Sequence, residues 1–522
     1  MCPCRVNASY LSGWRIWRHS ANPPSEDGEL SGSMGLFYNF SVCLFSALGS
    51  FLFGDSGIIG SVVSKQFDLF QTYFHNPGPS IIGAIVSTFA GGCFFGAAAA
   101  GSLATRIGRK RTIQLGALVA ILGCSLQTGA RNVSYLIVGR LIAGLAIGCL
   151  SMVVPLYQSE ISPPEIRGFL TGLTQFMISI GFLVANWVGY GCQFLRTDAQ
   201  WRVALGIQIF PAALLFLGMF VLPYSPRWLV EKGRNDEAFA IVQRLHGTKD
   251  NEEFIALEFA EMKEQIRYEQ ENYSTQFSDL WSTKPMLRRT LTGMAVQICT
   301  QFTGINVSSY FQPTLYAALG LSGSKILMIT GINGALGAVV TIIFIYFFLD
   351  RVGRKSPLIL GSFGMAISLA VEAAINAKWG GVDSTNHPAQ TAGVAFIIIF
   401  SSLFFSTSFG PVSWVYQSEI FPMRVRAIGT SVCTCANWAS NVLISQVSPI
   451  GMARLQYRFY IVFVVTNIVN AFIVLFFFPE TKGKTLEEMD AVFGDQVIPH
   501  ALETKRTNNI GVEDEKSRES DV

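Results

Sequence analysis

The two halves of this chain repeat three sequence signals in the same order, on either side of a charged central stretch. A basic loop at residues 108–111 (GRKR) recurs at 353–356 as GRKS. The segment 157–161 (YQSEI) recurs unchanged at 416–420. A proline-led segment then closes each half, PYSPRWL in the first and PETKGKTLEEM in the second. Three repeats in the same order predict two copies of one domain joined by a linker.

Each copy is apolar along almost its whole length. Hydrophobic residues make up 50% of the 522 residues and charged residues only 14%, whereas a soluble domain carries about 25% charged residues. Many stretches reach the ~20 residues that cross a ~30 Å hydrocarbon core. We therefore predict an all-α membrane protein with twelve transmembrane helices in two six-helix bundles, an arrangement typical of secondary transporters. The predicted spans are 36–58, 81–102, 112–129, 134–156, 169–190, 203–222, 290–312, 326–349, 356–377, 392–415, 427–447 and 458–478.

The loops predict how the chain sits in the membrane. Basic residues concentrate in the four short loops on the side of the two termini, and the positive-inside rule places that side in the cytosol. We expect a multi-pass protein of the plasma membrane with both termini cytosolic. In the central stretch, Ile255, Phe259, Met262 and Ile266 share one helical face. The predicted regions are an N-terminal tail (1–34), an N-terminal bundle (35–222), a cytosolic linker with amphipathic helices (223–289), a C-terminal bundle (290–478) and a C-terminal tail (479–522).

Several classes of function are not expected. The net charge of +3 is too small to indicate nucleic-acid binding. The sequence offers no nucleophile–base pair, metal cluster or phosphate loop, so we predict neither an enzyme nor a cofactor. Most cysteines are scattered through apolar stretches, and Cys433 and Cys435 have no second CxxC or histidine near them, so no metal site is predicted. The expected partners are a small solute, protons and the lipid bilayer, and we expect a monomer.

Charged residues inside predicted spans form the first group of candidates. Asp55 lies in the first span and Arg140 in the fourth. An ionisable group at membrane depth costs on the order of 3 kcal/mol unless it is paired or hydrated, and it marks a candidate functional site. An aspartate that faces water can carry a proton, and contact with an arginine would lower its proton affinity. We predict proton coupling through this pair; the alternative is a static pair that locks two helices.

Uncharged hydrogen-bonding side chains and tryptophans also fall in apolar spans. A ligand with many hydroxyl groups needs neutral donors and acceptors, which amides supply together, and flat rings that cover its C–H faces. The alternative for each amide is a hydrogen bond that holds two helices together. The candidate substrate-binding residues are Gln175, Gln301, Asn306, Trp414, Asn437 and Trp438.

Charged residues at the cytosolic helix ends form a third group. Three charged groups lie at helix ends: Glu160 with Arg167, Glu419 with Arg426, and Asp350 with Arg351 and Arg354. Pairing of these charges across the two halves would close the inner mouth of a transporter. A single surface pair contributes only ~0–1 kcal/mol, so any gate must act as a network. The alternative is that these charges only set topology. The full candidate gate is Arg106, Arg109, Glu160, Arg167, Arg227, Asp350, Arg354, Glu419 and Arg426.

Over residues 45–490 the sequence resembles the sugar porter family of the major facilitator superfamily in a fungal-type form. The resemblance rests on the two RxGRK loops, PLYQSEISPPEIRG, PYSPRWLVEKGR, QFTGINVSSYFQP, GPVSWVYQSEIFPMRVRAIG and PETKGKTLEEM. It implies the major facilitator fold, a central sugar site and alternating access. It also implies that Asp55 stands where proton-coupled members carry a carboxylate and that Arg140 is its partner. By position, the six candidates named above would contact the sugar, and the charged network would form the inner gate.

The sequence departs from this pattern in four places. The first span reads FGDSG where the family has Phe-Gly-Tyr-Asp-x-Gly, and one missing residue turns the upstream part of a helix by about 100°. Thr105, Tyr224 and Thr300 stand where the family has Asp, Glu and Gln. The prediction is a transporter of a monosaccharide or related polyhydroxylated solute by proton symport. The alternatives are a facilitator of the same fold and a non-transporting nutrient sensor, and quinate, polyols and disaccharides remain open as substrates.

Overall fold

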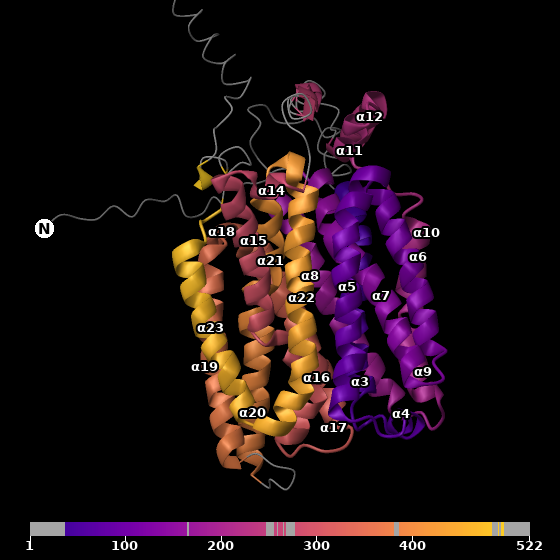
Figure 1. The fold of residues 1–522 in the computed structure, drawn as a ribbon, viewed down its shortest axis with the longest axis vertical. Helices are drawn as coiled ribbons and strands as arrows, with labels where there is room; N and C mark the ends of the chain where they lie inside the picture. Colours follow the sequence, from indigo (N-terminus) through magenta and orange to yellow (C-terminus); the bar gives the residue numbers. More distant parts are fainter. Residues whose placement is uncertain are drawn as a thin grey trace, which may run out of the picture.

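The described elements are helices that form two bundles side by side. The computed structural model describes residues 37–163, 166–246, 277–379 and 386–482, together with most of 255–267 and residues 489 and 492–494. Figure 1 shows the helices of the first half beside those of the second half, with their axes nearly parallel. The short helices α11 (Pro226–Glu231), α12 (Asn235–His246) and α14 (Asp279–Ser282) lie at one end, called here the linker end. The opposite end, which carries α4 (Asp68–Tyr73), is called the far end.

The first bundle contains six spans, as predicted. The first span runs continuously over Phe37–Val62. The helix tightens into a 3₁₀ turn directly after Asp55, so the residue missing from FGDSG does not interrupt the span. The elements of this bundle are α2 (Leu48–Asp55), η2 (Ser56–Ile58), α3 (Ile59–Val62), α5 (Pro79–Ile107), α6 (Arg109–Thr128), α7 (Val133–Ile161), α8 (Arg167–Cys192), α9 (Ala199–Gly206) and α10 (Ile209–Gly218).

The second bundle repeats the six spans, but two of them are broken near mid-length. Nine of the described helices are long and apolar enough to cross a membrane on length and composition alone; the spans formed by α6, by α15 with α16, and by α22 are more polar and complete the two sets of six. The elements are α15 (Lys284–Phe302), α16 (Ile305–Ala318), α17 (Lys325–Phe347), α18 (Leu349–Val352), α19 (Lys355–Trp379), α20 (His387–Ile398), the π-helical turn η4 (Ile399–Phe405), α21 (Phe409–Glu419), α22 (Met423–Leu455) and α23 (Arg458–Phe477).

The two bundles meet chiefly along two helix pairs, α5 with α22 and α8 with α17, with smaller contacts that include α8 with α21. Toward the linker end, the Ser431 hydroxyl donates to the Ala97 carbonyl at 2.6 Å. Toward the far end, the Ser87 hydroxyl donates to Gln446 Oε1 at 2.7 Å. Polar contacts of this kind between spanning helices are worth about 1 kcal/mol each. The bundles therefore touch on both sides of the membrane midplane.

Glycines let α5 and α7 pack backbone against backbone. A Cβ atom on Gly92 would lie 2.3 Å from the Leu141 carbonyl oxygen, and one on Gly148 would lie 2.0 Å from that of Cys93. Such distances cannot be accommodated unless the helices move apart. Gly91, the neighbour of Gly92, would place a Cβ with no heavy atom within 4 Å.

We expect Gly92→Ala to destabilise the protein by about 1–3 kcal/mol through overpacking of a tight helix contact. Gly91→Ala is the matched control, because it makes the same chemical change one position away in open space. The measurement is thermal unfolding of the purified protein in detergent. Equal melting temperatures for the two variants would show that the α5–α7 contact is not the constraint described here.

The amphipathic face predicted in the linker packs inward. Ile255 and Ile266 are buried, and Ile266 belongs to an apolar cluster with Trp228 and Leu229 of α11. Phe259 and Met262 pack against the same cluster. This confirms the shared face and supports a structural role for it.

Candidate functional site

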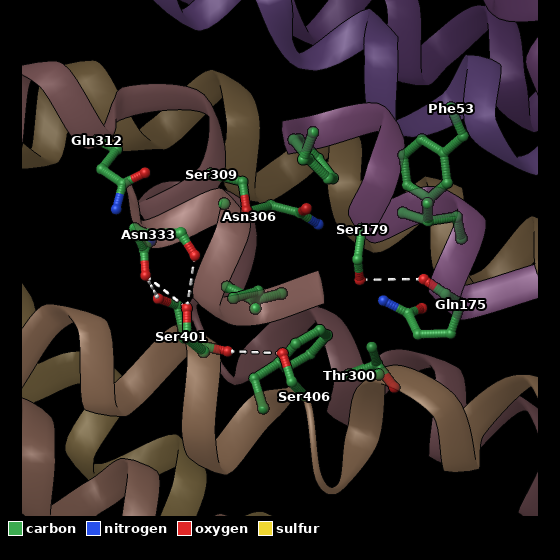
Figure 2. A pocket seen from close by; sticks show the side chains of 18 of the residues that line it. Phe53, Gln175, Ser179, Thr300, Asn306, Ser309, Gln312, Asn333, Ser401 and Ser406 are labelled. Carbon is green, nitrogen blue, oxygen red and sulfur yellow. Dashed lines mark hydrogen bonds between the residues drawn. The ribbon is translucent and has the colours of Figure 1, made fainter. Parts of the chain in front are cut away.

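A cavity lies between the two bundles, midway between their ends, and contains about 840 Å³ of empty space. It is called here the central cavity, and Figure 2 shows its lining. No lining side chain carries a charge, and most of the polar ones are amides or hydroxyls. The lining comprises Phe53, Gln175, Ile178, Ser179, Phe182, Asn186, Thr300, Gln301, Ile305, Asn306, Ser309, Gln312, Asn333, Gly334, Gly337, Ser401, Ser402, Phe405, Ser406, Gly410, Trp414 and Asn437.

The break between α15 and α16 creates the densest part of this polar lining. Gly304 adopts φ +88°, a left-handed conformation that suits glycine, and its close approach to the Phe463 ring leaves no room for a Cβ. Gln301 lies in the last turn of α15 and Asn306 in the first turn of α16, so the break directs both amides into the cavity. Interrupted helices of this kind build substrate sites in many transporters.

A network of amides fixes the orientation of Gln301. Its Nε2 donates to Asn437 Oδ1 at 2.5 Å, and its Oε1 accepts from Asn306 Nδ2 and, at 3.3 Å, from Asn441 Nδ2. Three elements, α15, α16 and α22, are joined through one side chain. Buried polar networks with their members satisfied are rigid and specify a single arrangement.

The opposite wall combines an amide with aromatic rings. Trp414 Nε1 donates to Gln175 Oε1 at 3.2 Å, which joins α21 of the second bundle to α8 of the first. Phe53 and Phe182 line the same region of the cavity. Their rings lie 6.4 Å apart in an edge-on arrangement. The wall therefore offers hydrogen-bonding atoms and flat apolar faces together.

Thus five of the six predicted substrate-binding residues meet in one cavity. Other lining residues were not predicted, although the sequence carries one signal for some of them. Four residues of α8 recur at spacings of three and four and therefore share one helical face: Gln175, Ser179, Phe182 and Asn186. No comparable signal marks Asn333, whose Oδ1 accepts hydrogen bonds from two serines of the π-helical turn η4 (Figure 2). π-helical turns often occur at functional sites.

Trp438, the sixth predicted residue, does not line the central cavity. This side chain is fully buried outside the lining, its Nε1 donates to Ser151 Oγ at 3.2 Å, and its ring packs on Phe53 with centroids 5.0 Å apart. Successive residues on a helix point about 100° apart, so Asn437 and Trp438 cannot both face the cavity. Asn441, one turn beyond Asn437, continues the cavity side of α22.

Trp414 and Trp438 form a matched pair for mutation, because each indole donates one hydrogen bond at 3.2 Å and only Trp414 lines the cavity. We expect Trp414→Phe to raise KM for uptake about tenfold, since the lost donor and ring area together are worth ~1–2 kcal/mol. Trp438→Phe should leave KM close to that of the parent protein and lower stability. Equal changes in KM would exclude a specific role for Trp414.

The structure does not pair Asp55 with Arg140. Asp55 is buried, and its Oδ1 has no hydrogen-bond partner among the described residues. The Arg140 guanidinium lies over the Phe89 ring at 4.3 Å, and its Nε donates to the Ile85 carbonyl at 3.4 Å. Both charges act on Cys124, so they share one region of the first bundle without forming an ion pair. In this conformation they do not lock two helices together.

Two ion pairs join predicted gate charges in the described part of the chain. Arg109 Nη2 contacts Glu160 Oε1 at 2.7 Å, and Arg354 Nη2 contacts Glu419 Oε1 at 2.7 Å. Each pair joins residues of the same half, and each is extended by the segment that follows that half. Ser225 donates to Glu160 at 2.5 Å, and Thr481 donates to Glu419 at 2.7 Å. The pairs therefore fasten the linker and the C-terminal segment to their own bundles.

The other predicted gate residues have varied surroundings. Arg106 is exposed at the end of α5. Arg426 is buried and donates to the Phe421 carbonyl at 3.2 Å. Arg227 lies in α11, partly buried. The side chains of Arg167 and Asp350 lie outside the described part of the chain.

The two halves differ at the proline-led segment. In the second half, Glu480 accepts hydrogen bonds from the backbone N–H groups of Arg354 and Lys355 at 2.9 and 3.0 Å. Burial raises the pKa of Glu480, but these donors and those of residues 481 and 482 outweigh it and hold the pKa below its usual value. In the first half Tyr224 takes this place, stacks on Trp228 with centroids 5.6 Å apart, and accepts from Arg111 Nε at 3.1 Å.

We expect the Glu480 contacts to make stability depend on pH in the acid range. A carboxyl whose pKa is lowered by folding stabilises the protein above its unfolded pKa, about 4.3 for glutamate, and loses that contribution as the pH falls through its folded pKa. Glu480→Gln should lower the melting temperature at neutral pH and flatten its decline in acid. Glu264→Gln, at an exposed linker site, is the control. An unchanged acid profile in Glu480→Gln would contradict this assignment.

Two helical bundles around a buried polar cavity, with helices broken at that cavity, define a membrane transporter. The family description "Sugar (and other) transporter" matches residues 42–493, so the chain belongs to the sugar porter family of the major facilitator superfamily.

Individual relatives agree with this assignment. The chain is 37% identical over 469 residues to the MFS-type transporter criB of Aspergillus cristatus, covering 90% of this chain and 96% of the relative. It is 34% identical to a high-affinity glucose transporter of Kluyveromyces lactis, covering 88% and 86%. Among solved structures, it resembles the proton:xylose symporter XylE bound to 6-bromo-6-deoxy-D-glucose, with a TM-score of 0.76, 26% identity and coverage of 88% and 99%.

Proposed function

We propose that this protein is a proton-coupled symporter of a neutral monosaccharide in the plasma membrane, with its linker end in the cytosol. The observation that carries the proposal is the central cavity, whose lining consists of amides, hydroxyls, aromatic rings and apolar groups and carries no charge. A sugar presents many hydroxyl groups, each both donor and acceptor, and amide side chains match both roles. By position, Gln175, Gln301, Asn306, Trp414 and Asn437 would hold it.

The uncharged lining also supports a neutral substrate over an anionic one. A carboxylate taken out of water costs far more than a hydroxyl unless a cation or several donors accompany it, and proteins usually supply an arginine or lysine for this purpose. The central cavity offers neither. We therefore favour sugars and polyols over quinate.

Proton coupling is proposed on the position of Asp55. A buried carboxyl group with an unpartnered oxygen in a membrane span is costly as a charge, and protonation removes that cost. One elementary charge that crosses 100 mV is worth ~2.3 kcal/mol, so one proton per sugar supports about fiftyfold accumulation. Arg140, close by but unpaired, is positioned to favour release of the proton if the two side chains meet in another conformation.

Alternating access would use the features described at the linker end. The Arg109–Glu160 and Arg354–Glu419 pairs hold each bundle together as one body, and the bundles would rotate about the cavity as such bodies. Because these pairs lie within each half, the contacts that break during opening would be those between α5 and α22 and between α8 and α21, such as the Trp414–Gln175 hydrogen bond.

The test is uptake of labelled sugars and polyols by a yeast strain that lacks hexose transport, with and without a protonophore. The proposal predicts accumulation above the external concentration that collapses when the proton gradient is removed. Saturable uptake that the protonophore does not change would identify a facilitator. Absence of uptake of every solute, with the protein present at the cell surface, would favour a non-transporting sensor.

A further inference from the structure

A second carboxyl group is buried in the membrane region, in the half of the protein opposite to Asp55. Glu372 lies on α19, seven residues before its end at Trp379, which places it about 10 Å from the far end of that helix. Its exposed fraction is 0%. Asn376 Nδ2, one turn along α19, donates to its Oε1 at 2.7 Å. Its Oε2 has no hydrogen-bond partner in the described part of the chain.

The groups that face Glu372 are neutral or weakly acidic. The phenols of Tyr316 on α16 and Tyr460 on α23 both interact electrostatically with its carboxyl group. From α20, Gly393 comes so close that a Cβ would lie 3.3 Å from Oε2. Among the described side chains no ion pair involves Glu372. A carboxylate in such a place has no compensating cation, whereas a protonated carboxyl group carries no charge and can donate a hydrogen bond.

Glu372 lies between two cavities. The second, called here the far cavity, contains about 2550 Å³ of empty space, and Asn376 and Tyr460 are among its lining residues. Its lining also includes the exposed residues Lys65, Asp68 and Gln456 of far-end loops, so it opens to solvent at that end. The two cavities touch different faces of α16: Asn306, Ser309 and Gln312 line the central cavity, and Ser308, Phe311 and Leu315 line the far cavity.

A chain of polar groups joins these cavities through Glu372. Gln312 lines the central cavity (Figure 2), and its Nε2 donates to the Tyr316 hydroxyl at 2.8 Å. The Tyr316 phenol interacts electrostatically with Glu372 but makes no hydrogen bond to it in this conformation, and Asn376, which donates to Glu372, lines the far cavity. Gln312 and Tyr316 lie one turn apart on α16, and Glu372 and Asn376 lie one turn apart on α19. One turn of each helix therefore supplies all four polar side chains between the cavities.

We propose that Glu372 is a second proton-binding site of this protein, reached from the far cavity, whose protonation is sensed in the central cavity through Tyr316 and Gln312. When the two side chains come together, a carboxylate at Glu372 accepts a hydrogen bond from the Tyr316 hydroxyl, which keeps its proton. The Tyr316 oxygen then accepts from Gln312 Nε2, as it does in this structure, and the amide presents its oxygen to a ligand. A protonated Glu372 instead donates a hydrogen bond to the Tyr316 oxygen, the Tyr316 hydroxyl donates to Gln312 Oε1, and the amide, rotated by half a turn, presents its N–H groups. The only covalent bond that forms or breaks is the O–H bond of Glu372, whose proton comes from the far cavity.

This chemistry favours a proton over a metal ion. Among the described residues there is no group of three or more His, Cys, Asp and Glu side chains placed to bind a metal, and hard cations take six or more oxygen ligands. The link to sugar binding rests on the proposed function, but proton binding at Glu372 does not.

The first experiment therefore uses no sugar. Infrared spectra of the purified protein are recorded against pH for Asp55→Asn and for Asp55→Asn with Glu372→Gln, and their difference isolates Glu372. We expect the band of a protonated carboxylic acid to give way to that of a carboxylate as the pH rises. A carboxylate at every pH, or a band that never changes with pH, would overturn the proposal. If Glu372→Gln does not fold, Glu372→Asp replaces it, and the acid band should shift in position.

The second experiment measures binding of D-glucose by tryptophan fluorescence against pH in the Asp55→Asn background, in which Asp55 no longer titrates. We expect Kd to change about fivefold with pH, the net worth of one hydrogen bond. Tyr316→Phe should abolish that change while the Glu372 infrared band still titrates. A pH-dependent Kd that survives Tyr316→Phe would overturn the coupling route. If the parent protein does not bind glucose, the result contradicts the proposed function as a monosaccharide transporter. The infrared experiment then tests proton binding at Glu372 independently.

Discussion

Replacing Gln301 by leucine should lower kcat/KM for sugar uptake about 100-fold. Gln301 connects Asn437, Asn306 and Asn441 in one network, and leucine would leave those amides without their partner in a buried site. Orphaned buried polar groups cost about 1–3 kcal/mol each, and a site built to hydrogen-bond a hydroxyl loses selectivity and rate when its donors and acceptors are removed. The measurement is the initial rate of labelled sugar uptake against concentration, normalised to protein at the cell surface.

Gln208→Leu is the matched control for this variant. Gln208 is a buried amide in the α9–α10 span, outside the central cavity, and its Nε2 has no hydrogen-bond partner within the described structure. Leucine there removes no contact to substrate, so kcat/KM should stay within about twofold. Comparable losses in both variants would mean that any buried amide supports the fold, and the role assigned to Gln301 would fail.

Asp55→Asn should abolish accumulation of sugar while sugar still equilibrates across the membrane. Asparagine is close to aspartate in size but cannot bind and release a proton, so the gradient no longer drives uptake. One proton per sugar at 100 mV supports a ratio of internal to external sugar of up to ~50. In Asp55→Asn this ratio should fall to about 1. The measurement is the steady-state ratio of a non-metabolised sugar analogue in energised cells.

Exchange of labelled for unlabelled sugar provides the control for this variant, because exchange needs alternating access but no net proton movement. Exchange should continue at a rate similar to that of the parent protein. If Asp55→Asn still accumulates sugar, Asp55 is structural. If exchange stops as well, the side chain is needed for movement of the bundles, and the assignment to proton coupling is not supported.

The fold could be predicted from the sequence because duplication and hydropathy are patterns spread over many residues. Three repeated signals and twelve apolar runs predicted two bundles of six spans, and no single residue decides that outcome. The seventh span was predicted as continuous over 290–312, and only the structure shows the break at Gly304 that directs Gln301 and Asn306 into one cavity.

Individual side-chain contacts were harder to predict from the sequence, because they depend on which face of a helix packs against which neighbouring helix. The rotation between adjacent positions separates Asn437 from Trp438. Glu160 contacts Arg109, since Gly108, at φ +86°, turns the chain and sets Arg109 against the end of α7. Glu372 escaped notice as one charge in an apolar run, and its burial between two cavities is visible only when α16, α19 and α23 are packed together.

The most direct test of proton-coupled sugar transport is the pH of a weakly buffered suspension of cells or proteoliposomes when the transported sugar is added. Symport predicts an immediate alkaline shift outside, proportional to the sugar taken up, that is absent in Asp55→Asn and in vesicles without the protein. Sugar entry at an undiminished rate with no change in external pH would contradict the account and identify a facilitator built on the same fold.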